Sequence, residues 1–168
     1  MAGFETLGTG WPRVGLSSMG IRRPGNATNV QRGMGGMSTM AAMPVLAILA
    51  AAVAALVHVW FFALESVLFE RPTVFKRFGL RSAEDAATVR PMAFNQGFYN
   101  LFLAIGIAVG LVLVVTGQEA AGRAIVLFAC ACMVGAGAVL LATSRRFLTA
   151  AAIQAGPPLV TLLATLFL

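Results

Sequence analysis

Charged side chains are scarce in this sequence, where Asp, Glu, Lys and Arg make up 11% of 168 residues. Soluble domains contain roughly 25% charged residues, so this composition excludes a soluble globular fold for most of the chain. Hydrophobic residues account for 59%. We therefore expect an integral membrane protein whose first partner is the lipid bilayer.

Metal-binding side chains are also few, with one histidine and two cysteines in the whole sequence. Cys130 and Cys132 lie two positions apart in an apolar run, which separates them by about 200° around a helix. They cannot chelate one ion together, and one His with one Glu falls short of the usual zinc ligand set. We predict no metal and no cofactor. A haem held by His58 alone is the open alternative.

Long hydrophobic runs dominate what is present. Four runs are long enough to cross a bilayer as helices, at about 44–67, 94–115, 124–143 and 147–168. They predict an all-α, four-helix transmembrane bundle over 43–168 with one long loop after the first span. Residues 1–42 are polar, rich in Gly, Ser and Met, and are expected to form a disordered tail or to reflect a misassigned start.

The excess of basic residues gives a formal net charge of +6. In a membrane protein such residues flank the spans and set orientation, so no nucleic-acid partner is predicted. The long loop and the turn after the third span carry Arg71, Lys76, Arg77, Arg81, Arg90, Arg145 and Arg146. The positive-inside rule then predicts a cytoplasmic loop with both termini outside.

Two ionisable residues lie within the first span. His58 and Glu65 are seven residues apart, so they share a helical face with an offset of about 10 Å along the axis. The same face carries the small residues Ala47, Ala51, Ala54 and Ala55, followed by Phe62. Small residues allow close helix contact, so this face is expected to point into the bundle. The opposite stripe is bulky and is expected to face lipid: Leu49, Val53, Leu56, Trp60 and Leu64.

Polar residues of the other spans fall at similar depth. Gln96, Tyr99 and Asn100 share a face near the start of the second span, beside Asn95. Gln154 lies near the start of the fourth, ahead of Pro157 and Pro158, which should kink that helix. Counting residues from the cytoplasmic ends places these groups with His58 and Glu65 in one leaflet. We predict a polar intramembrane pocket there.

The long loop is expected to contain a short helix capped by Ser82, with Asp85 at the capping-box position, and ended by Arg90-Pro91. Phe75 and Phe78 alternate with basic residues, which is typical of a segment lying in the membrane interface. A lid over the pocket is one interpretation, and a passive interfacial connector is the favoured one.

The string Asn95-Gln96-Gly97-Phe98-Tyr99-Asn100, with the run from His58 to Glu65 and Gln154-Ala155-Gly156-Pro157, resembles the bacterial domain-of-unknown-function family 1304. The resemblance covers roughly 45–168. It implies a four-helix protein of the bacterial inner membrane and brings no established activity.

Three functions remain open from the sequence. The favoured hypothesis is a pocket for a lipophilic small molecule with acid/base conversion, such as isomerisation, cyclisation or epoxide opening. His58 and Glu65 would be catalytic, and the substrate would be held by Asn95, Gln96, Tyr99, Asn100, Gln154 and Phe62. The alternatives are a proton-coupled transporter and a structural protein without chemistry. The small-residue faces favour a homo-oligomer.

Overall fold

The computed structural model describes residues 42–168. Within this range, four helices are long and apolar enough to cross a membrane, and no strand is present. The first is α2 (Val45–Phe62), continued by the π-helical turn η1 (Ala63–Val67). The others are α4 (Ala83–Val115), α5 (Glu119–Thr143) and α6 (Leu148–Phe167). The predicted all-α transmembrane bundle is confirmed, whereas 1–41 of the predicted tail lie outside the described residues.

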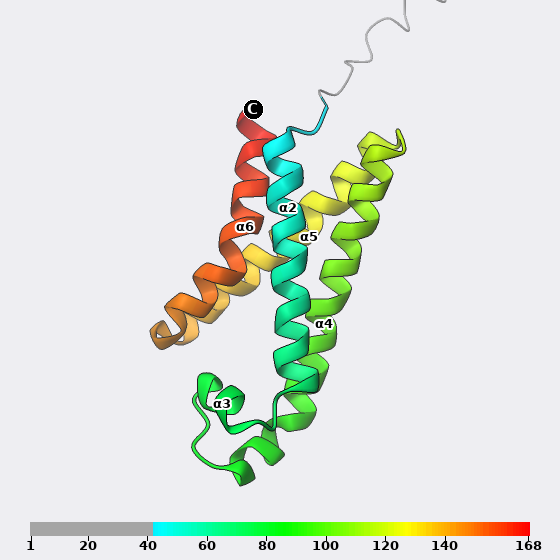
Figure 1. Ribbon diagram of the computed structural model, residues 1–168. Coiled ribbons are helices and arrows are strands. Elements are labelled where there is room, and N and C mark those ends of the chain that lie inside the picture. The colour runs from blue at the N-terminus through cyan, green and yellow to red at the C-terminus, as the bar shows by residue number, and fades with distance from the viewer. Residues whose placement is uncertain (1–41) are drawn as a thin grey trace, which may run out of the picture. The chain divides into compact units, whose positions relative to one another are not determined.

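The four helices form a closed ring of antiparallel neighbours. α2 packs against α4 and α6, α5 packs against the same two helices, and α2 and α5 lie diagonally with little contact. The turns between α4 and α5 and between α5 and α6 are short, which forces successive helices to run antiparallel. The C-terminus therefore lies beside the start of α2, at the end of the bundle opposite α3 (Pro72–Phe75) (Figure 1).

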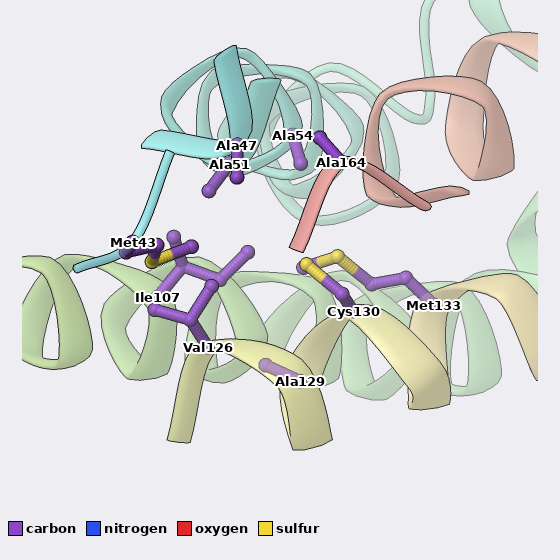
Figure 2. Packing of buried hydrophobic residues seen from close by; sticks show 10 residues of the cluster. All are labelled: Met43, Ala47, Ala51, Ala54, Ile107, Val126, Ala129, Cys130, Met133 and Ala164. Carbon is purple, nitrogen blue, oxygen red and sulfur yellow. The ribbon is translucent and has the colours of Figure 1, made fainter. Parts of the chain in front are cut away.

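Small side chains hold the centre of the bundle together. Ala47, Ala51 and Ala54 of α2 are fully buried, and they face Ile107 of α4 and Val126 of α5 across the core (Figure 2). Lipid tails are as apolar as these side chains, so stability comes from the close contact that small residues permit. The predicted buried stripe of the first span is confirmed at these three alanines.

The long loop is folded on a small core of its own. It contains α3 and the 3-10 turn η2 (Lys76–Phe78). Phe69 and Phe75 pack there with Ala86 and Ala93 of α4, so the loop is anchored on the first turns of the second membrane helix.

The expected break at Arg90-Pro91 is wrong. Ser82 and Asp85 do form a capping box, but the helix it starts continues through Pro91 to Val115. Proline removes the amide that would bond the carbonyl of Ala87. Ala87 is exposed, so its carbonyl can be solvated and the helix is not forced to end there. With 33 residues, α4 is about 50 Å long, and its first turns extend beyond the hydrocarbon layer.

The last helix tolerates two prolines. α6 remains helical across Pro157 and Pro158 and bends along its length in Figure 1. The Thr161 hydroxyl donates a hydrogen bond of 3.1 Å to the Pro157 carbonyl, which adds a bond inside the helix close to the disrupted turn. The expected kink is therefore a bend within one continuous helix.

Candidate functional site

A cavity of about 820 Å³ opens at the loop end of the bundle. Its lining residues come from all four membrane helices, from η1 and η2, and from the turn that joins α5 to α6. Its wall is mainly hydrophobic, with side chains such as Phe61, Leu64, Leu140 and Ile153. The volume falls within the range of roughly 300–1,000 Å³ found for small-molecule sites.

The polar side chains of this cavity come from every part of the bundle. They are Glu65 of η1, Gln96 of α4, Thr143 of α5, Thr149 and Gln154 of α6, and two arginines, Arg77 and Arg146. A mostly apolar wall with a few converging polar groups is the usual composition of a ligand site. Of the polar residues predicted to converge at one end, the structure places Glu65, Gln96 and Gln154 in this wall.

Glu65 is the acidic residue of this wall. Its side chain is 8% exposed, and its Oε2 accepts a hydrogen bond of 2.8 Å from Asn100 Nδ2, itself 3% exposed. Among the described residues, no second hydrogen bond to this carboxyl group is found. Asn100 thus fixes one oxygen of the carboxyl group, while Glu65 still contributes to the cavity surface.

A local change of helix geometry turns Glu65 inward. The amide of Leu68 bonds the Ala63 carbonyl at 2.9 Å, a five-residue spacing that defines the π-helical turn η1. A π-helical turn is wider than an α-helical one, so successive side chains are separated by a smaller angle around the axis. The adjacent Leu64 and Glu65 therefore share one buried face. The prediction that Leu64 faces lipid is wrong for this reason, whereas Leu49, Val53, Leu56 and Trp60 are exposed as expected.

Gly97 allows η1 to approach α4. A Cβ atom at Gly97 would collide with Ser66 Oγ and would lie 3.1 Å from Glu65 Cβ. The Ser66 hydroxyl in turn donates a hydrogen bond of 3.0 Å to the Phe94 carbonyl. The absent side chain at Gly97 is thus a condition for the contact between Glu65 and Asn100.

Four of the predicted substrate-binding residues lie outside the cavity wall, and one of them is Asn100, which is buried and bonds Glu65. Tyr99 is 58% exposed, Asn95 is exposed, and Phe62 packs edge-on against Phe98 with ring centres 5.2 Å apart. The buried face of α4 is instead centred on Gly97 and Asn100, because the closest helix approach is set by the glycine. With Gly97 and Asn100 facing the other helices, Tyr99 points away from the bundle.

His58 is buried apart from the cavity. Its side chain is 0% exposed, and Nδ1 lies 2.9 Å from the Ala54 carbonyl, to which it donates. Nε2 has no hydrogen-bond partner among the described residues. The structure therefore does not bring His58 and Glu65 to one surface, although they are only about two helical turns apart.

No three His, Cys, Asp or Glu side chains within 42–168 are grouped so as to hold a metal ion. Cys130 is buried in the core and Cys132 is exposed.

A family model described as "Protein of unknown function (DUF1304)" matches residues 52–166. The chain belongs to this family. Searches of curated proteins and of solved structures gave no match. The segment matched to DUF1304 contains every residue that lines the cavity, and also Asn100, which bonds Glu65 from outside the wall.

Sequence reasoning missed the two cavity arginines. Each belongs to a triplet of a basic residue, arginine and phenylalanine, at Lys76-Arg77-Phe78 and Arg145-Arg146-Phe147. Both triplets form 3-10 turns, η2 and η3 (Arg145–Phe147), and both direct their arginine and phenylalanine to the cavity. The repeated triplet is the signal from which this pairing was predictable. Both triplets lie within the DUF1304 match.

Proposed function

We propose that this protein binds a lipophilic small molecule in the cavity at the loop end of the bundle and transfers protons to and from it through Glu65. In this proposal the loop end faces the cytoplasm, in accordance with the concentration of basic residues there. The ligand enters from the adjoining membrane leaflet rather than from water.

The observation that carries the proposal is a buried carboxyl group in the wall of a mostly apolar cavity of about 820 Å³. An ionisable side chain within a membrane span is expensive to keep and marks a functional site by default. Glu65 has a single amide donor, Asn100, and no cationic partner among the described residues. A purely structural role would be served by a neutral residue at lower cost.

The arrangement fits proton transfer at carbon or at a polarised oxygen. The Glu65 carboxylate removes a proton from one position of the ligand, and the resulting carboxylic acid returns a proton to another position. An isomerisation of this kind moves a double bond, consumes no co-reactant and leaves Glu65 in its starting form. Gln96 and Gln154 supply amide groups that orient the ligand, since both line the same wall.

Proton transfer is assigned to Glu65 rather than His58 because only Glu65 lines the cavity. The buried His58 would need a relay to reach a ligand. Among the described residues, its ring bonds only to the carbonyl of Ala54.

The test is exchange of ligand hydrogen with solvent. Purified protein is incubated in D₂O with the total lipid extract of the cells that make it, and the lipids are analysed by mass spectrometry. We expect one lipophile to gain deuterium or to change retention with the parent protein and with Glu70→Gln, an exposed acidic control at the same end. Glu65→Gln should abolish the change.

No change with the parent protein would contradict the conversion. Proton-driven accumulation of a lipophile in vesicles, lost in Glu65→Gln, would then assign the protein to transport.

A further inference from the structure

The positive and negative charges of the side chains that line the cavity are not equal in number. The charged side chains there are Arg77, Arg146 and Glu65, so positive charge is in excess even when Glu65 is ionised. An ion pair of 3.1 Å joins Arg90 to Glu70, and within 42–168 neither cavity arginine forms an ion pair. Arg77 and Arg146 are both exposed, which leaves their guanidinium groups accessible at the cavity.

Arg146 is held in place by its surroundings. Its guanidinium carbon lies 4.6 Å from the centre of the Phe147 ring, a cation–π contact. The same group lies against the backbone of Gly79, where a Cβ atom would lie 2.9 Å from Nη2. Gly79 has φ +82°, the left-handed conformation that glycine adopts without strain. The end of η2 and the turn η3 therefore meet at this arginine.

The two basic–Arg–Phe turns form a matched pair around one cavity. η2 contributes Arg77 and Phe78, and η3 contributes Arg146 and Phe147. The first residue of each triplet, Lys76 or Arg145, is exposed and does not line the cavity. Attraction to lipid headgroups would act equally on the first and second residues of each triplet, since both are basic. Only the second residue, Arg77 or Arg146, lines the cavity.

We infer that the cavity takes a single-chain amphiphile with an anionic head, which Arg77 and Arg146 bind while its apolar chain lies against the hydrophobic wall. This inference rests on the proposed function and narrows its ligand class. Arginine presents two parallel N–H donors that match the oxygens of a carboxylate or a phosphate. The apolar wall, which includes Leu140 and Ile153, suits a hydrocarbon chain.

The test uses Trp60, which lines the cavity and is one of two tryptophans in the chain. In a Trp11→Phe background it is the sole tryptophan, and a bromine atom close to it quenches its fluorescence. Protein in dodecyl maltoside micelles, in alkaline buffer, is titrated with ω-bromoundecanoate and with its neutral analogue ω-bromoundecanol. We expect saturable quenching by both, with a lower Kd for the carboxylate.

Matched variants separate the cavity arginines from their neighbours. Arg77→Gln and Arg146→Gln should each raise the Kd of the carboxylate about tenfold, the loss expected for one charge-assisted contact. Lys76→Gln and Arg145→Gln should leave it unchanged, and none of the four should alter the Kd of the alcohol. Equal effects of Arg145→Gln and Arg146→Gln on the carboxylate would overturn the inference.

Competition with the unmodified Trp11→Phe protein tests the same inference without any arginine variant. Laurate or dodecyl phosphate should displace the bromocarboxylate, and inorganic phosphate should not. Preference for laurate would assign a fatty carboxylate and preference for dodecyl phosphate a phosphate-headed lipid, and either supports the inference. Displacement by inorganic phosphate alone would overturn it.

The outcome also distinguishes this inference from the function on which it rests. Saturable binding of alcohol and carboxylate with equal Kd would overturn the anionic head and leave the lipophile site intact. Absence of saturable quenching by either probe would contradict both.

Discussion

The carboxyl group of Glu65 and the side-chain amide of Asn100 form a hydrogen bond of 2.8 Å between two membrane helices. Both residues are buried at the end of the bundle where the cavity opens. The bond joins the π-helical turn after α2 to the middle of α4, so it fixes the position of the acid as well as the contact between the helices.

Replacing Asn100 by Ala removes the donor and leaves Glu65 buried without a partner. We expect the free energy of unfolding to fall by about 0.6–1.7 kcal/mol, the range measured for interhelical hydrogen bonds in membranes. Unfolding in mixed detergent and SDS micelles measures this loss. Asn95→Ala, an exposed amide on the same helix, is the control and should have no effect. In a double-mutant cycle with Glu65→Ala, which removes the acceptor, strictly additive losses would show that the two side chains do not interact.

Gly97→Ala should lower the free energy of unfolding although it adds only one methyl group. The added methyl group would collide with Ser66 Oγ and lie 3.1 Å from Glu65 Cβ, so Ser66 would have to give up its bond to the Phe94 carbonyl and Glu65 would have to shift slightly away from α4. Forcing an extra methyl group into close packing costs about 1–3 kcal/mol. The matched control is Gly106→Ala, because a Cβ there meets nothing within 4 Å. Unfolding in mixed micelles should show a loss for the first variant only, and equal losses would contradict the close approach.

Substitution of His58 by Leu should be tolerated. One nitrogen of the buried ring has no hydrogen-bond partner among residues 42–168, and an apolar side chain removes that unsatisfied group. We expect the free energy of unfolding to change by less than about 1 kcal/mol, and ligand quenching of Trp60 to be unchanged. A loss of ligand conversion in a stable His58→Leu protein would instead reveal a proton relay through Nε2.

Gly79→Ala should weaken binding of anionic amphiphiles by displacing Arg146. Alanine is strained by about 1–2 kcal/mol at positive φ, and its methyl group would press on the guanidinium group. Titration of Trp60 fluorescence with ω-bromoundecanoate should give a higher Kd, with the Kd of the bromoalcohol unchanged. Gly117→Ala is the control, since Gly117 has φ +88° but has no atom near its Cβ position. Similar increases in both variants would indicate a general loss of structure.

Much of the fold follows from the sequence because lipid imposes a simple rule on it. Long apolar runs become helices, and small residues such as Ala47 and Ala51 mark the face along which helices meet. The convergence of Glu65, Gln96 and Gln154 followed from chain direction and depth alone.

The errors have local causes that composition does not reveal. Leu64 is buried because the wider π-helical turn η1 places it on one face with Glu65, and no sequence feature marks such a turn. Tyr99 faces outward because α4 contacts η1 through Gly97. The sequence pattern alone, which places Gln96, Tyr99 and Asn100 on one helical face, does not reveal this contact. The sequence does not distinguish Arg146 from Arg145 as a cavity residue, because the position of Arg146 involves a contact with Gly79, which is remote in the sequence.

The central claim is tested most directly by filling the cavity with a larger side chain and measuring whether ligand binding is lost. Ala136 lines the cavity on α5, and Ala138 lies two residues away on the same helix, exposed and outside it. Saturable quenching of Trp60 by ω-bromoundecanol should be lost in Ala136→Phe and retained in Ala138→Phe. Full binding by the Ala136→Phe protein, or equal loss in both variants, would contradict a lipophile site in this cavity.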